Sequence, residues 1–297
     1  MAIELGARGV WFYPDALASD EVVAFARRVE ALGYGALWLP EAGGRDPFAL
    51  AARLLDHTDR LVVATGVANV YARDAHAMKA AQHTLAEQSG GRFLLGIGIS
   101  HRLLVEDVRG HRYGPPLATM RAYLDALDAA DYGAVAPRER PPRVLAALGP
   151  RMLALARERA DGAHPYMVTP AHTREARAAL GPARLLCVEQ KVVLEADVAR
   201  GRAIARASAA IAMGLTLPNY RRSLLRQGFA EADFGEDGPS DRVVDAVVAI
   251  GDASALEARL RAHSDAGATH VCVHPLHPEG RSEPHWPVLE ALAPAHA

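Results

Sequence analysis

Two titratable side chains stand directly behind two predicted strands in the first half of the chain. Glu41 follows the apolar run 36–40, and His101 follows the run 93–99. A carboxylate and an imidazole that face one pocket can move a proton, because histidine titrates near neutral pH. We predict Glu41 and His101 as the catalytic residues, with His101 exchanging the substrate proton and Glu41 orienting the reacting group. In the plainer alternative, Glu41 pairs with Arg45 and His101 closes a loop.

Other polar residues lie at or near the ends of further predicted strands. Asn69 follows the third strand, where it can either turn a loop or contact a ligand. His164 lies in a weaker strand over 163–168, and we expect it to be packed and hydrogen-bonded. His274 ends the last strand beside a proline, and we expect a surface loop there that also carries His277.

The sequence lacks the motifs of several other cofactor and metal sites. Gly96-Ile97-Gly98 opens like a dinucleotide-binding fingerprint, but the third glycine and a helix directly after it are missing. No Walker loop, HExxH or GxSxG motif occurs. The spacing of the histidines supports no metal centre, and we predict none.

Charge and cysteine content narrow the class of partner. The chain has 33 basic and 35 acidic residues, a net charge of −2, and so no bulk positive field to attract nucleic acid or an anionic membrane. Cys187 and Cys272 both lie in apolar runs, which excludes a disulfide framework and suits a reducing compartment. Neither a signal peptide nor an apolar run of about 20 residues is visible. We therefore expect a cytoplasmic protein with a small-molecule substrate.

Eight short apolar runs alternate with amphipathic helical segments, and these elements must position the polar residues. Such alternation indicates parallel βαβ units in an α/β fold, and the count of eight favours a (β/α)8 TIM barrel over an open doubly wound sheet. Catalytic residues of such barrels lie at the carboxyl ends of the strands. We predict one domain over 1–297, with a helical insertion over about 196–269, between strands seven and eight. The predicted strands are 9–13, 36–40, 61–67, 93–99, 143–148, 163–168, 185–195 and 270–274.

Five segments of the chain resemble the luciferase-like monooxygenase superfamily, a set of TIM barrels that use a flavin or a deazaflavin. They occur in the family's order and at its spacing, between residue 3 and about residue 278, and the run 89–98 is the most specific. Within the superfamily, the chain is most similar to the branch of oxidoreductases that depend on coenzyme F420, an 8-hydroxy-5-deazaflavin. The segments are ALWLPE (36–41), ATGVANVY (64–71), SGGRFLLGIG (89–98), AALGPRM (146–152) and ADG (160–162).

The resemblance implies how these segments would meet the coenzyme. A bulge with a non-proline cis peptide between Gly66 and Val67 would back the deazaflavin ring, and Asn69 would contact the ring edge. Glu41 would lie beside the reactive ring carbon, and His101 would take the place of a catalytic acid. The cofactor-binding residues that the resemblance implies are Gly66, Val67, Ala68, Asn69, Gly98, Ala147, Leu148, Gly149, His164, Tyr166 and Met167.

The resemblance also implies a reaction class. A deazaflavin carries two electrons as a hydride and reacts poorly with oxygen, which favours hydride transfer between coenzyme F420 and an unknown small organic substrate. An FMN-dependent monooxygenase on the same fold and a non-catalytic deazaflavin-binding protein remain as alternatives. Relatives often form dimers through barrel helices, so we expect a homodimer. The preference for arginine over lysine suits GC-rich actinobacteria, in which this coenzyme is common.

Overall fold

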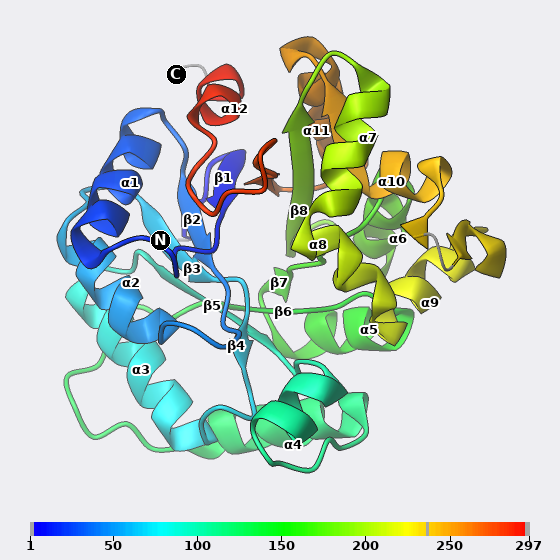
Figure 1. Ribbon diagram of the computed structural model, residues 1–297. Coiled ribbons are helices and arrows are strands. Elements are labelled where there is room, and N and C mark those ends of the chain that lie inside the picture. Colours follow the sequence, from blue (N-terminus) through cyan, green and yellow to red (C-terminus); the bar gives the residue numbers. More distant parts are fainter. Residues whose placement is uncertain (1–2, 236–237, 295–297) are drawn as a thin grey trace.

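Eight parallel strands close into a ring, which confirms the predicted (β/α)8 barrel (Figure 1). The computed structural model describes residues 3–235 and 238–294, so residues 1, 2 and 295–297 of the predicted domain lie outside the described part. Pairing of Gly162 with Leu185 closes the ring. The barrel strands are β1 (Arg8–Trp11), β2 (Ala36–Leu39), β3 (Val62–Thr65), β5 (Phe93–Gly98), β6 (Arg143–Leu145), β7 (Gly162–Ala163), β8 (Leu185–Leu194) and β12 (His270–Pro275).

Helices follow the barrel strands and form the outer layer of the molecule (Figure 1). Local sequence fixes where several of them begin. The carboxylate of Asp46 accepts hydrogen bonds from the backbone N–H groups of Phe48 and Ala49, both at 2.9 Å, and so caps the helix that starts at Pro47. The helices around the barrel are α1 (Ser19–Ala31), α2 (Pro47–Asp56), α3 (Ala75–Gln88), α4 (Pro116–Ala129), α5 (Pro150–Arg159), α6 (Pro170–Leu180), α11 (Ala253–Asp265) and α12 (Trp286–Ala291).

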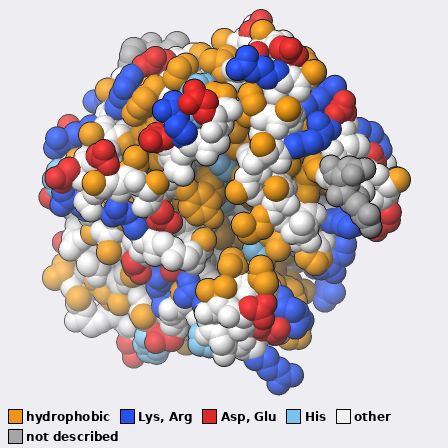
Figure 2. Space-filling view, in the orientation of Figure 1, with side chains coloured by type: hydrophobic (Ala, Val, Ile, Leu, Met, Phe, Trp, Pro, Cys, Tyr) orange, Lys and Arg blue, Asp and Glu red, His pale blue; other side chains and the backbone are white. Residues whose placement is uncertain are grey.

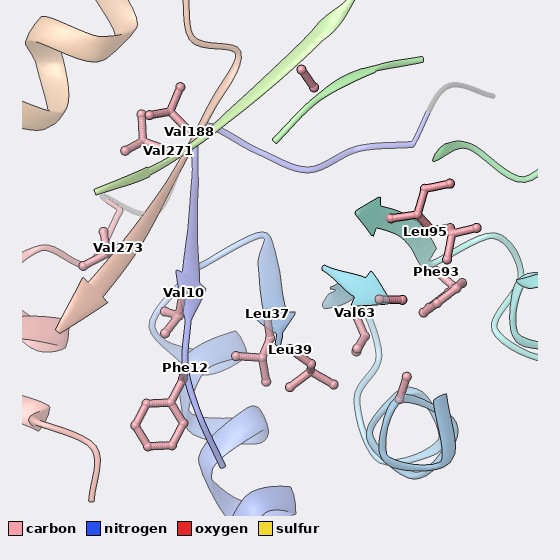
Figure 3. Close-up of a cluster of buried hydrophobic side chains, with 14 of the residues drawn as sticks. Val10, Phe12, Leu37, Leu39, Val63, Phe93, Leu95, Val188, Val271 and Val273 are labelled. Carbon is pink, nitrogen blue, oxygen red and sulfur yellow. The ribbon is translucent and has the colours of Figure 1, made fainter. Parts of the chain in front are cut away.

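Side chains alternate between the two faces of each strand and form two hydrophobic layers. Val10, Leu37 and Phe93 belong to the large cluster shared with the helices, shown in Figure 3. Their neighbours along the strands, such as Trp11 and Trp38, belong to a separate cluster. This second cluster fills the inside of the barrel, as expected for a fold whose centre is packed and whose site lies at one end.

Two predicted strands are shorter than expected. The strand predicted over 163–168 is limited to Gly162–Ala163, because Pro165 has no N–H to donate to a neighbouring strand. The strand predicted over 143–148 ends at Leu145. In both cases the remaining residues leave the sheet at the carboxyl end of the barrel and become part of the loops there.

The predicted insertion between the seventh and eighth barrel strands is present, but it contains a strand that the sequence did not reveal. The helix predicted over 241–250 ends at Val247, and β11 (Val248–Gly251) follows. This strand pairs in parallel with the last residues of β8, from Lys191 to Leu194. The other elements of the insertion are α7 (Val198–Ala207), α8 (Ala209–Ala212), α9 (Pro218–Arg226), α10 (Asp241–Val247) and the small hairpin β9 (Phe234–Gly235) and β10 (Gly238–Pro239).

The insertion stands on one side of the barrel, opposite α1, α2 and α3 (Figure 1). Its hydrophobic cluster, in which Ile211, Leu224 and Val244 are fully buried, also includes Met167 and Val193 of the barrel. No helix among the described residues combines the length and the apolar character needed to cross a bilayer.

Candidate active site

The carboxyl ends of the barrel strands carry an aromatic and ionisable set of side chains. Trp11 is in ring contact with Tyr13, Tyr166 and His274, at centroid distances of 5.0, 5.3 and 4.4 Å. Figure 2 shows this molecule hollowed near the centre of the visible face, with hydrophobic and histidine side chains inside the hollow. We refer to the space beside these residues as the barrel mouth.

The third strand is interrupted at the predicted place. The peptide between Gly66 and Val67 is cis, which confirms the sequence prediction, and pairing resumes beyond it with β4 (Ala68–Asn69) against β5. The indole N–H of Trp11 donates a hydrogen bond of 2.8 Å to the carbonyl oxygen of Gly66. The first strand thereby holds the shape of the interrupted third strand.

Glycine at position 98 leaves room for this interrupted segment. A Cβ atom at Gly98 would lie 2.8 Å from a methyl carbon of Val67 and 3.1 Å from the Cβ of Ala146. Neither distance is tolerated without movement of the neighbour. Gly98 therefore leaves room for the side chain of Val67, so that the residue after the cis peptide packs directly on β5.

Glu41 is held by an arginine that the sequence analysis did not identify. Arg73 donates to both of its carboxylate oxygens, at 2.8 and 2.6 Å, and the backbone N–H of Asn69 donates to it at 2.6 Å. The alternative pairing of Glu41 with Arg45 is therefore wrong. Arg45 binds Ser19 Oγ instead. Glu41 connects the end of β2 to the segment that follows the cis peptide.

Asn69 and His101 are held by neighbours at different parts of the mouth. The side-chain oxygen of Asn69 accepts a hydrogen bond of 2.9 Å from the backbone N–H of Tyr71, which is the turn that the sequence offered as one alternative. His101 faces α9, where Asn219 hydrogen-bonds its ring and the Tyr220 ring lies 5.6 Å away. Burial lowers the pKa of His101 below its ordinary value, against the opposing effect of Asn219. A neutral imidazole at pH 7 is the result.

His164 lies inside the barrel, packed and hydrogen-bonded as expected. Its Nδ1 is 2.8 Å from the carbonyl oxygen of Cys187, and its ring stacks on Trp38 with centroids 4.3 Å apart. Burial lowers its pKa to about 4. Its Nε2 is buried without a hydrogen-bond partner among the described residues, and a Cβ atom placed on Gly66 would lie 3.3 Å from it. One unpaired polar atom therefore lies next to the cis peptide.

The predicted cofactor-binding residues 147–149 and 166–167 lie in two loops at the same end of the barrel. Ala147, Leu148 and Gly149 lead from β6 into α5, and the carbonyl oxygen of Leu148 accepts a hydrogen bond of 2.8 Å from His172 Nε2. In the loop after β7, Met167 has a positive φ of 56°. Its N–H donates to Glu189 at 3.1 Å.

A buried ion cluster faces the mouth, and the sequence analysis missed it. Glu189 and Lys191 lie on the inner face of β8, and the lysine Nζ is 2.9 and 3.1 Å from the two carboxylate oxygens. Nδ1 of His274, on β12, lies 2.7 Å from Glu189 Oε1. The expectation that His274 lies on a surface loop is wrong: it is 7% exposed, and its side chain points into the barrel towards Trp11. Tyr166 completes the cluster, with the lysine Nζ 3.6 Å from its ring centroid.

A signal for this cluster is present in the sequence. Glu189 and Lys191 are two residues apart inside the apolar run LLCVEQKVVL, so a strand places both on one face. Charged residues are almost never buried unless they are paired. Together these rules point to an interior ion pair. The third member, His274, belongs to another strand and could not be joined to the pair without the fold.

No group of three or more potential metal ligands occurs among residues 3–235 and 238–294. The cluster of Glu189, Lys191 and His274 contains a cation of its own, and this neutralises the carboxylate that a metal would need. The described mouth is instead suited to a flat organic group, since its walls are aromatic rings and glycine backbone.

The fold and this mouth define a parallel barrel with an aromatic, ionisable site at its carboxyl end. A family model for luciferase-like monooxygenases matches residues 6–270, and the chain belongs to this family. A Mycobacterium tuberculosis protein, provisionally named a coenzyme F420-dependent oxidoreductase, is 35% identical over 117 residues, which are 39% of this chain and 33% of that protein. The 5,10-methylenetetrahydromethanopterin reductase of Methanolobus tindarius is 28% identical over 174 residues, 52% of each chain. The matches thus span only a third to a half of these curated relatives.

Solved structures share the fold over nearly the whole chain. An F420-dependent secondary alcohol dehydrogenase, in complex with an F420-acetone adduct, has a TM-score of 0.73 at 12% identity, with 97% of each chain covered. The oxygenating constituent of 3,6-diketocamphane monooxygenase from Pseudomonas putida, in complex with FMN, has a TM-score of 0.69 at 15% identity, with 97% of this chain and 96% of that chain covered. At such low identities these similarities show the fold alone.

Proposed function

We propose that this protein is an oxidoreductase that transfers a hydride between coenzyme F420 and a small organic substrate. The observation that carries the proposal is the aromatic lining of the barrel mouth, where Trp11 contacts Tyr166 and His274 and donates to the backbone of Gly66. The names of an M. tuberculosis relative and of a structural neighbour, both F420-dependent, support the choice of coenzyme.

The residues of the mouth fit a bound deazaflavin. The backbone of Gly66 to Asn69 would carry the face of the ring, and Gly98 would leave room for the Val67 side chain. The unpaired Nε2 of His164 offers one buried polar contact, and the loops 147–149 and 166–167 would hold the tail of the coenzyme. The coenzyme supplies a carbon that accepts or gives up a hydride, and the protein supplies position and proton transfer.

The chain's own residues would act around that ring. We propose that His101 faces the substrate, where its neutral imidazole can exchange a proton or hold the reacting oxygen. Glu41 is tied to Arg73 and to the N–H of Asn69, so it fixes the segment behind the ring. Direct contact of Glu41 with the substrate remains a prediction, as do the cytoplasmic location and the homodimer.

A titration of the purified protein with coenzyme F420 and with FMN, followed by fluorescence, tests the choice of coenzyme. We expect the deazaflavin to bind at least about tenfold more tightly, a difference of about 1.4 kcal/mol. Equal or tighter binding of FMN would replace this proposal by a flavin-dependent monooxygenase. Binding of the deazaflavin without its reduction or oxidation by any substrate in a broad panel would favour a carrier protein.

A further inference from the structure

Glu189 has a complete set of partners, and this decides how His274 is protonated. The carboxylate accepts hydrogen bonds from Lys191 Nζ and from the backbone N–H of Met167. The adjacent ammonium group is the largest influence that opposes burial, and it keeps the pKa of Glu189 low, at about 2. Glu189 is therefore an anion at neutral pH and can only accept from His274.

It follows that Nδ1 of His274 carries a proton. A neutral imidazole that donates from Nδ1 has its lone pair on Nε2. Burial lowers the pKa of His274 below its ordinary value, against the opposing effect of Glu189, so the neutral form predominates at pH 7. Within the described part of the chain, the hydrogen bond found for the His274 ring is the one at Nδ1, and Nε2 makes none. The ring is thus oriented by a carboxylate, with a free base at its other nitrogen.

His274 is linked to the proposed ring site through Trp11. Its ring packs on Trp11 at a centroid distance of 4.4 Å, and the same indole donates its N–H to the carbonyl oxygen of Gly66. The side chain of Trp11 therefore contacts both the carbonyl group of Gly66 and the ring of His274. The groups that face His274 are Glu189 and Lys191 from β8, Tyr166 from the loop after β7, and Trp11 from β1.

We propose that His274 is a catalytic base of this site, with Glu189 and Lys191 as its positioning residues. The inference rests on the proposed function and names its substrate class: a compound that releases a hydride and a proton together, as an alcohol does. Nε2 would accept the hydroxyl proton, and the oxidised coenzyme, when bound, would supply the hydride acceptor, so that the C–O bond of the alcohol becomes a carbonyl. The proton then passes from the imidazolium to solvent. His101, which is connected to His274 through the rings of Tyr220 and Tyr166, would hold the reacting oxygen.

The protonation of His274 can be measured without any substrate. Long-range nitrogen-15 spectra of protein labelled at histidine distinguish a proton on Nδ1 from one on Nε2, and the spectrum of His274→Asn assigns the signal. We expect the Nδ1-protonated neutral form at pH 7. Addition of oxidised coenzyme F420 should shift the His274 signals and leave those of His277 unchanged. His277 lies on the loop beyond β12, where its Nδ1 accepts from the backbone N–H of Glu279.

Turnover tests the role itself. Asparagine at position 274 places an amide N–H near the place of Nδ1, so the contact with Glu189 is kept while the base is lost. With secondary alcohols as probes, reduction of bound coenzyme F420 should be at least about 100-fold slower in His274→Asn, with unchanged coenzyme affinity. In the wild type the rate should fall at acidic pH as His274 becomes protonated. This fall should be absent in His274→Asn. The matched control, His277→Asn, should behave like the wild type.

Each failure has a distinct meaning. A proton on Nε2, absent shifts at saturating coenzyme, or a wild-type rate in His274→Asn would overturn the base assignment and leave the proposed function intact. Failure of the deazaflavin to bind at all would overturn both. Glu189→Leu removes the acceptor opposite Nδ1; if it does not fold because Lys191 loses its partner, the double variant Glu189→Leu, Lys191→Met removes the charge pair together. That variant should still lose the Nδ1-protonated form, which a merely structural carboxylate would not control.

Discussion

Replacing Lys191 by methionine removes the cation beside a carboxylate that is 1% exposed, and the structure allows the cost to be estimated. The pKa of Glu189 is about 2, against an ordinary value of 4.5. At about 1.4 kcal/mol per pKa unit, this difference amounts to roughly 3 kcal/mol of folding free energy. Breaking a buried ion pair on one side costs about 3–5 kcal/mol in other proteins. We therefore expect Lys191→Met to lower the free energy of unfolding by about 3–5 kcal/mol at pH 8.

The loss should depend on pH with a defined sign. A carboxylate whose pKa is lowered by folding stabilises the protein above its unfolded pKa, near 4.5, and this stabilisation is lost as the pH falls towards 2. Without Lys191, the pKa of Glu189 rises because burial then dominates. The variant can then protonate Glu189 at a higher pH. The difference in free energy of unfolding between wild type and variant should therefore become smaller as the pH is lowered from 8 to 5. Buried histidines such as His164, whose pKa is lowered by burial, destabilise both proteins in acid. Their contribution cancels when the free energies of unfolding of the two proteins are subtracted.

Urea unfolding of both proteins at pH 8 and pH 5 measures the two effects. Lys79→Met provides the control, because Lys79 is the chain's other lysine and binds carbonyl groups at the end of α4 near the surface. It should cost less than about 1 kcal/mol. A deficit below about 1 kcal/mol for Lys191→Met at pH 8, or a deficit that grows as the pH falls, would refute the electrostatic account of this cluster.

Three further changes test the rest of the mouth. His101→Ala should lower turnover by roughly 100-fold in steady-state assays, with little effect on the Kd of the coenzyme; a weakened Kd with normal turnover would contradict a substrate-facing role. Glu41→Gln should weaken coenzyme binding and turnover by about tenfold or more each, since it loses a charged hydrogen bond to its arginine partner; unchanged fluorescence titrations would argue against its positioning role. Gly98→Ala should push Val67 aside, cost about 1–3 kcal/mol in urea unfolding and weaken coenzyme binding, whereas Gly133→Ala, with open space around its Cβ, should do neither.

The order of the barrel elements could be predicted because each strand is a short apolar run bounded by turn residues. The exceptions have local causes. The run VVDAVVAI, at 243–250, is apolar apart from Asp245, so periodicity alone cannot show that a helix gives way to β11 at Val248. Its strand form depends on the free edge of β8, which exists only once the barrel has closed.

The site was predictable to the extent that its residues follow strands in the chain. The cis peptide at Gly66–Val67 could be named from a segment resemblance. The partners of Glu41 and His101 could not, because Arg73 and Asn219 lie in loops and helices whose position the tertiary fold decides. Proline beside His274 suggested an exposed loop, yet the strand continues to Pro275 and turns the imidazole inward.

The extra strand β11 has a consequence for how this protein can diversify. The long segment between β8 and α11 leaves and rejoins the barrel at one point, where the N–H of Glu195 donates to the carbonyl oxygen of Gly251 at 3.0 Å. The segment also has a buried cluster around Ile211, Leu224 and Val244, which meets the barrel at Met167, Val193 and Leu276. It is therefore built as an exchangeable cassette: its length and side chains, including those that face His101, can be replaced between two fixed ends. The cis-peptide side of the mouth, carried by other strands, would keep its shape through such an exchange.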